Sequence, residues 1–132
     1  MPESEHFKDA ELRCPCGCGL NNATPALLGA LEAVRTILGV PIHINSACRC
    51  EKHNTAVGGA KHSQHLVGNA ADIWAEGRTN QMLFRAAILI PEIRGMGMPC
   101  ADWLHIDVRA SKGLVRWRYD LHGRQIPWEV IA

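Results

Sequence analysis

Two histidines and one aspartate have the residue types and spacing of a catalytic zinc site. His65 ends a long loop-like stretch, and Asp72 follows it at the start of an expected strand. Gly68 and the pair Ala70–Ala71 between them are small, so the backbone can bend and let both side chains converge. His105, on a later strand, is the third candidate. Two imidazoles and one carboxylate would leave a fourth zinc position open for a water whose pKa the metal lowers.

Two further residues have chemistry that such a site needs. Asp102 precedes His105 by three residues. On a regular strand these two residues would face opposite sides of the sheet, so we expect a bend at Asp102, just after Met98–Pro99. From there its carboxylate could act as a general base on the metal-bound water and then protonate the leaving amine. The planar guanidinium of Arg49 is suited to bind a substrate carboxylate or carbonyl.

These residues lie in segments that resemble the zinc D-Ala-D-Ala carboxypeptidase and L-Ala-D-Glu endopeptidase family, and look most like its short phage and prophage members. The resemblance covers about residues 40–110 and rests on Ser46–Arg49, His53–Asn54, Val57–Ala60, Ser63-x-His65-x-x-Gly68-x-Ala70-x-Asp72 and Asp102-x-x-His105. The Cys-rich N-terminal segment and the helix expected after Thr24 are also similar. One position departs from the pattern, because many members carry an aromatic residue where this chain has Cys48.

The resemblance implies a role for each of these side chains. Three residues would hold zinc: His65, Asp72 and His105. Asp102 would be the general base, Arg49 would take part in catalysis and contact the substrate, and Ser63 would line the site. The implied fold is α+β, with a mainly antiparallel sheet packed against helices, as in hedgehog domains and D-Ala-D-Ala peptidases.

The function expected is that of a zinc metallopeptidase, with bacterial peptidoglycan stem peptides as its partner and substrate. It would be a D-Ala-D-Ala carboxypeptidase or an L-Ala-D-Glu endopeptidase, as in a phage endolysin. Two alternatives stay open: a non-catalytic phage structural or binding module that keeps the fold and the zinc, and a cytoplasmic dipeptidase acting on D-Ala-D-Ala. The Asp102 carboxylate favours the enzyme, because a binding module needs no base.

Each of these residues also has a simpler explanation. Without the resemblance, Asp72 could cap a turn, His105 could be a core histidine, and Arg49 could form a structural salt bridge. Asp107 shares a strand face with His105, so it either orients that ligand or forms a salt bridge with Arg109 or Arg116. We expect neither His43 nor His62 to be a ligand.

The six cysteines are the other unusual part of the sequence. Cys14, Cys16, Cys18 and Cys50 could form a second, structural zinc site, with Cys48 and His53 nearby in the sequence. One or two disulfides and six reduced thiols are the alternatives, and a cytoplasmic origin argues against a settled disulfide framework. The one-residue spacings are tighter than the usual Cys-x2-Cys zinc knuckle.

The elements that would position these residues follow from local patterns. Thr24 predicts a helix N-cap with Pro25 in the first turn, and Gly39 predicts its end. We expect a short strand over 41–45, a long functional loop over 46–69 and a strand over 70–74. A second helix should start after Thr79 and end at Pro91.

The second half of the chain predicts strands. Residues 93–98 and 103–108 are each expected to be extended, with Trp103, His105 and Asp107 on one face. Residues 114–119 and 125–131 predict a terminal hairpin whose turn, 120–124, surrounds Gly123. We expect Trp103, Trp117 and Trp128 to pack in the core and the hairpin, although one of them could flank the cleft.

Composition limits the function further. A chain of 132 residues predicts one domain over 1–132, in which 1–23 is an irregular Cys-rich segment. The net charge of +1 offers no basic face for nucleic acid, and the apolar stretches are too short to cross a membrane. Six charged residues within 1–13 exclude a signal peptide there. We therefore expect cytoplasmic synthesis and action on the wall after lysis, holin-mediated release or delivery from a virion.

Overall fold

The computed structural model describes residues 2–128 and has an α+β architecture, as expected. Six strands form one sheet in the order β1-β2-β4-β3-β5-β6, and every neighbouring pair is antiparallel except β3 and β5. The strands are β1 (His43–Ser46), β2 (Ala70–Trp74), β3 (Gly95–Met98), β4 (Leu104–Asp107), β5 (Val115–Tyr119) and β6 (Gln125–Pro127). The helices are α1 (Asp9–Leu12), α2 (Pro25–Leu38), α3 (Glu51–Ala56), the 3-10 helix η1 (Gln64–Val67) and α4 (Asn80–Ala87).

Helix α2 begins and ends at the residues that the sequence predicts. The Thr24 side chain accepts a hydrogen bond from the Leu27 backbone N–H, and Gly39 adopts a left-handed conformation after the last turn. The Thr24 hydroxyl also donates to Asn69 at 2.9 Å. The start of α2 is therefore tied to the segment that links η1 to β2.

Residues of the central strands alternate between two faces of the sheet. One face packs into the hydrophobic core and is lined by Ala71, Ile73, Met96, Met98, Leu104 and Ile106. The opposite face, called the site face here, carries Asp72, His105, Asp107, Gly95 and Gly97. Asp72 pairs directly with His105 across β2 and β4. The two-residue period thus gives the core its apolar side chains and brings two ionisable groups together.

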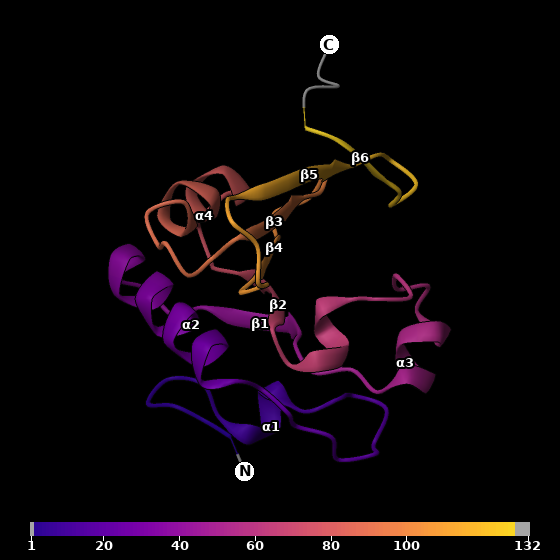
Figure 1. Cartoon of the computed structure of the whole chain (residues 1–132). Coiled ribbons are helices and arrows are strands. Elements are labelled where there is room, and N and C mark those ends of the chain that lie inside the picture. Colours follow the sequence, from indigo (N-terminus) through magenta and orange to yellow (C-terminus); the bar gives the residue numbers. More distant parts are fainter. Residues whose placement is uncertain (1, 129–132) are drawn as a thin grey trace.

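The helices cover the sheet from two sides (Figure 1). Helices α2 and α4 contact each other on the side of the core, and α4 also contacts β4. Helix α3 and η1 lie on the other side, with the segment that carries His65 (Figure 1). Within residues 2–128, no helix is both long and apolar enough to span a membrane.

Several local expectations differ from the structure. The segment 46–69 is not one loop, because it contains α3 and η1. Helix α3 has no apolar period, and its N-cap is Cys50, whose sulfur accepts from the His53 N–H. The four-residue α1 was not predicted, and α4 ends at Ala87, before Pro91. The turn at Gly123 is as predicted, whereas residues 129–131 of the expected last strand lie outside the described residues.

Candidate metal centre

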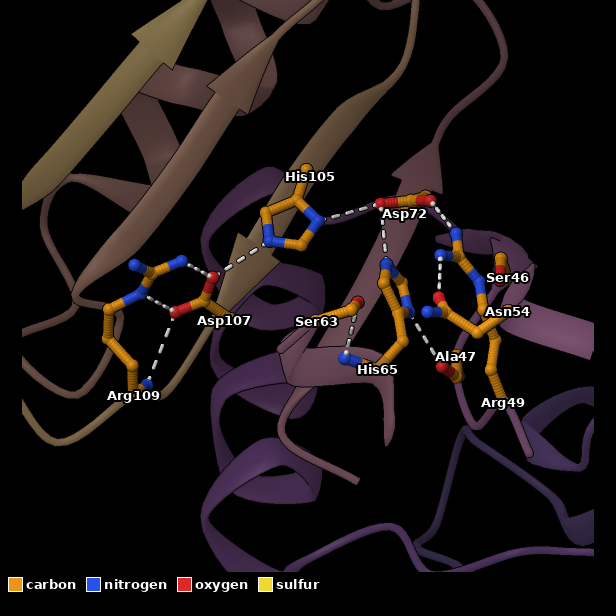
Figure 2. A network of polar contacts seen from close by, with 10 residues as sticks. All are labelled: Ser46, Ala47, Arg49, Asn54, Ser63, His65, Asp72, His105, Asp107 and Arg109. Atoms are coloured by element: carbon orange, nitrogen blue, oxygen red, sulfur yellow. Dashed lines mark hydrogen bonds and ion pairs between the residues drawn. The ribbon is translucent and has the colours of Figure 1, made fainter. Parts of the chain in front are cut away.

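The side chains of His65, Asp72 and His105 point toward one another and meet in one place (Figure 2). They come from η1, β2 and β4, and all three are buried. His65 Nε2 lies 3.3 Å and His105 Nδ1 lies 3.0 Å from the same Asp72 oxygen, Oδ1. One potential ligand atom from each residue lies within 4.8 Å of the other two. The structure therefore brings together the three residues that the sequence nominates as zinc ligands.

Local structure around η1 explains how His65 reaches Asp72. Ser63 is the N-cap of η1, and its hydroxyl accepts a hydrogen bond from the His65 N–H at 3.2 Å. Gly68 ends η1 with a φ of 73°, and a Cβ there would fall 1.9 Å from the Asn22 carbonyl oxygen. Only glycine fits that position, and the left-handed turn directs the chain into β2.

Each imidazole makes a contact through the ring nitrogen that points away from Asp72, and this contact bears on where the ring carries its proton. His65 Nδ1 lies 2.7 Å from the Ala47 carbonyl oxygen, which can only accept, so Nδ1 carries the proton. His105 Nε2 lies 2.8 Å from Asp107 Oδ2. When both imidazoles are neutral, with the proton of His65 on Nδ1 and that of His105 on Nε2, two imidazole lone pairs and one carboxylate oxygen point at one another. A cation between them would remove that repulsion, and this donor set suits zinc.

Asp107 fixes His105 and is itself held by Arg109. The Asp107 side chain is fully buried, and Arg109 donates to both of its oxygens at 2.8 Å. Burial would raise the pKa of Asp107, but Arg109 and His105 outweigh burial and hold it at about 2. The sequence offers two roles for Asp107, and this side chain fills both. It orients the candidate ligand His105, and it forms the salt bridge with Arg109.

Ionisation of the metal-free centre follows from the same contacts. Burial would raise the pKa of Asp72, yet the hydrogen bond with His105 and the close contact with His65 prevail and hold this pKa well below its ordinary value. Burial would lower the pKa of His105, but the facing carboxylates of Asp107 and Asp72 raise it to about 9. In the metal-free protein, the proton on His105 thus supplies part of the positive charge that a metal ion would supply.

Arg49 contacts the candidate ligand Asp72 at Oδ2, the carboxylate oxygen that the two histidines do not contact. Its Nη2 donates to Asp72 Oδ2 at 3.4 Å, its Nε to Ser46 Oγ at 3.1 Å and its Nη1 to Asn54 Oδ1 at 3.2 Å (Figure 2). The buried Asn54 also donates to the Ala60 carbonyl at 2.9 Å, which fixes the turn after α3. The sequence includes Asn54 in a motif, but it gives no signal that this amide holds Arg49.

A cavity of about 860 Å³ opens onto the three candidate ligands. Arg49 and Ser63 line it, as predicted, together with Trp103, Trp117 and Tyr119. The Trp117 ring lies tilted beside His105, with centroids 5.2 Å apart. Arg109 after β4 and the hairpin residues Arg116, Arg124 and Gln125 complete this side. Sequence reasoning allowed that one tryptophan flanks the cleft, but it did not place these arginines or Gln125 there, because they lie beyond the motifs.

Asp102 lies in the bend that the sequence predicts before β4. The Asn80 amide holds this bend through the carbonyl oxygens of Pro99 and Ala101. Asp102 is exposed and, within residues 2–128, is not among those that line the cavity. The structure therefore brings Arg49 and Ser63 to the candidate ligands, and leaves Asp102 at the surface near the start of β4.

The two remaining histidines of interest lie apart from the three candidate ligands. His62 is exposed at the wall of the cavity, and His43 stacks on Trp74 with ring centroids 4.3 Å apart. Neither belongs to a group of potential metal ligands in the described part of the chain.

Cysteines form a second group of potential ligands. Cys14, Cys16, Cys18 and Cys50 gather in one place, whereas Cys48 is buried and Cys100 is exposed elsewhere. All six cysteines, which fall within the described residues, are thiols and not disulfides.

Comparison with known proteins agrees with this geometry. No curated protein matches the sequence. A family model described as Peptidase M15 matches residues 5–107, from the N-terminal segment to the end of β4. The matched range contains all three residues of the buried histidine–aspartate group, and the peptidases of this family are zinc-dependent, in agreement with the donor set. The chain belongs to the Peptidase M15 family.

Proposed function

We propose that the protein is a zinc peptidase that hydrolyses a peptide bond in peptidoglycan stem peptides, as a D-Ala-D-Ala carboxypeptidase or an L-Ala-D-Glu endopeptidase of the phage endolysin type. The observation that carries this proposal is the convergence of His65, Asp72 and His105 on one buried point beneath an open cavity. Family membership supports the peptidase chemistry.

The residues present divide the work of amide hydrolysis among them. Zinc bound by the three ligands would supply Lewis-acid chemistry, polarising the scissile carbonyl and favouring ionisation of water. Arg49 would bind a carbonyl or carboxylate of the peptide, since its guanidinium lines the cavity and is already oriented by Ser46 and Asn54. Ser63 would line the same subsite while it caps η1.

The wall of the cavity favours an anionic peptide. Four arginines line it, against one carboxylate, Asp72, among the described residues. Arg109 is paired with Asp107 at 2.8 Å and Arg124 with Asp120 at 3.0 Å. Exposed Arg116, and Arg49 with its longer contact of 3.4 Å to Asp72, are therefore the cations best placed to meet a ligand. Stem peptides carry the carboxylates that such a wall would attract. Trp103 and Trp117 would pack against the peptide backbone between these charges.

We assign proton transfer to Asp102. It precedes His105 by three residues, in the bend before the strand that carries this candidate ligand, and Asn80 holds this bend in place. Contacts for proton transfer are often long in the absence of substrate and tighten when substrate binds. The exposed Asp102 carboxylate would therefore transfer the proton once a peptide occupies the cavity.

Digestion of purified peptidoglycan by the zinc-loaded protein tests the proposal. Mass spectrometry of the new termini should show released D-Ala for a carboxypeptidase, or a new D-Glu amino terminus for an L-Ala-D-Glu endopeptidase. His105→Ala should release neither product. Binding of stem peptide without any cleavage would reject the enzyme in favour of a non-catalytic binding module.

A further inference from the structure

A second potential metal site lies outside the cavity, at the junction of two distant chain segments. Cys14, Cys16 and Cys18 come from the turn after α1, and Cys50 comes from the start of α3. The Sγ atoms of Cys14 and Cys16 lie 3.5 Å apart, those of Cys16 and Cys50 3.6 Å, and those of Cys14 and Cys50 3.8 Å. The Cys18 sulfur lies within 4.8 Å of the other three.

These separations are those of sulfurs around one ion. With zinc–sulfur bonds of about 2.3 Å, neighbouring sulfurs of a tetrahedral site lie about 3.8 Å apart. In an iron–sulfur cluster the four thiolates are divided among two or four irons, so thiolates on different irons must stand farther apart. The packing of the four sulfurs therefore favours a single metal ion with four thiolate ligands.

The backbone around the cysteines is shaped to bring the sulfurs together. Gly17 and Gly19, which alternate with the cysteines, have φ values of 91° and 81°, a region that other residues seldom adopt. The Cys14 N–H donates to the Leu20 carbonyl at 2.8 Å and closes this turn. The glycines thus explain how one-residue spacings can present three sulfurs to one point.

Cys50 is oriented by its own helix. Its sulfur accepts a hydrogen bond from the His53 N–H at 3.4 Å, which holds the side chain at the start of α3. The imidazole of His53 does not belong to the group of potential ligands. Four cysteines therefore complete the site without a histidine.

We propose that Cys14, Cys16, Cys18 and Cys50 bind one structural zinc ion. Four thiolates fill a tetrahedral coordination shell and leave no open position for substrate or water, which separates this site from the three-ligand centre. The ion joins the N-terminal segment to the start of α3, a link otherwise made near this point by the hydrogen bond from the Cys48 N–H to the Leu12 carbonyl.

The position of the four cysteines also links their metal ion to the substrate-binding arginine. Cys50 directly follows Arg49, whose backbone N–H donates to the His65 carbonyl at 3.1 Å. An ion that fixes Cys50 therefore also restrains the chain that presents Arg49 to Asp72. Loss of this ion should loosen the substrate-binding arginine without removing any ligand of the catalytic centre.

Metal analysis of single variants tests this inference independently of catalysis. The purified wild-type protein should contain two zinc ions per chain, one for each group of ligands. Cys18→Ser and His105→Ala should each contain one, and the matched control Cys100→Ser, at an exposed thiol outside the group, should keep two. One zinc in the wild-type protein, unchanged in Cys18→Ser, would overturn the inference, as would iron in its place.

Spectroscopy and thiol chemistry on the wild-type protein cover the case in which Cys18→Ser fails to fold. Replacement of zinc by cobalt should give thiolate-to-cobalt charge-transfer absorption, which a histidine–aspartate site cannot produce. In the zinc-loaded protein, Cys14, Cys16, Cys18 and Cys50 should resist alkylation until a chelator is added, whereas exposed Cys100 reacts and buried Cys48 is shielded by the fold itself. Free reaction of the four clustered thiols before a chelator is added, or a mass lower by two hydrogens per disulfide, would refute the site even if the protein hydrolyses peptidoglycan.

Discussion

Gly95 lies opposite Asp107 across β3 and β4, and a Cβ atom on Gly95 would fall 2.2 Å from Asp107 Oδ1. A second close approach occurs two residues further along β3. There Gly97 pairs with His105, and a Cβ atom on Gly97 would fall 2.5 Å from the Trp117 ring nitrogen. Glycine on β3 thus leaves the space that Asp107 and Trp117 occupy beside His105.

Gly95→Ala should disturb the metal centre from outside it. The added methyl group must displace the buried Asp107 carboxylate, and with it the orientation of His105. We expect zinc affinity to fall about 10–100-fold, the range seen when partners of metal ligands are lost. Isothermal titration of the metal-free protein with zinc checks this, with Gly113→Ala as a control, since a Cβ there meets nothing within 4 Å. Equal affinities in the two variants would show that the close approach has no effect.

Asp107→Asn should also weaken zinc binding, through the imidazole. The amide cannot replace a carboxylate that faces both His105 and Arg109, and it leaves the Arg109 charge without its partner. We expect about a 10–100-fold loss of zinc affinity while the three ligands remain. Glu92→Gln, at an exposed acid away from the cavity, is the control. Unchanged zinc affinity in Asp107→Asn would mean that His105 needs no carboxylate partner.

The contribution of His105 to the stability of the metal-free protein should fall as pH rises from about 6.5 to 9. The folded state raises the pKa of His105 from an ordinary 6.5 to about 9, because Asp107 and Asp72 face it. A raised pKa stabilises the folded state fully below the unfolded value, and this stabilisation is lost as pH rises through the folded value. At about 1.4 kcal/mol per pKa unit, the loss amounts to a few kcal/mol.

Urea unfolding of metal-free wild-type protein and His105→Gln checks this pH dependence. Both proteins keep the same cysteines and the other histidines, so the difference between their free energies of unfolding isolates His105. This difference should shrink between pH 6.5 and pH 9. A difference that is constant over that range would contradict the charged state assigned to His105.

Arg49→Lys should impair substrate binding while zinc stays bound. Lysine keeps the charge but cannot make the three contacts that the guanidinium makes with Ser46, Asn54 and Asp72. We expect kcat/KM to fall by about tenfold or more, since a hydrogen bond to a charged group is worth about 1.5–3 kcal/mol. Arg85→Lys, at an exposed position of α4, is the matched control. Equal kcat/KM values for both variants would remove Arg49 from the substrate site.

Asp102→Asn should separate proton transfer from metal binding. Asparagine keeps the size of the side chain but cannot accept the proton, so hydrolysis should fall by about 10²–10⁴-fold. The variant should fold, bind zinc and bind stem peptide like the wild-type protein, as metal analysis and peptide titration can show. Turnover at the wild-type rate would assign the base to another residue.

Patterns that depend on neighbours in the sequence predict much of the fold. The cap at Thr24 and the stop at Gly39 predict α2, and a period of two predicts that His105 and Asp107 share a face. Asp72 and His105 become direct partners because β2 and β4 pair, a long-range event that the motif indicates only indirectly.

Other features depend on contacts that no local pattern reports. Helix α3 lacks an apolar stripe and is stabilised by its Cys50 cap and the turn that Asn54 fixes. Glycine is unfavourable in strands, so Gly95 and Gly97 weaken the prediction of β3 from the sequence. In the structure, these two glycines make room for Asp107 and Trp117. The hairpin wall of the cavity arises because β5 pairs in parallel with β3, and sequence alone does not select that neighbour.

Hydrolysis of stem peptide as a function of added zinc tests the central claim most directly. The metal-free wild-type protein should be inactive, and its activity should rise with zinc until the centre formed by His65, Asp72 and His105 is filled. His105→Ala should stay inactive at every zinc concentration that saturates the wild-type protein. Activity in the metal-free protein, or zinc-dependent activity in His105→Ala equal to that of the wild type, would contradict the account.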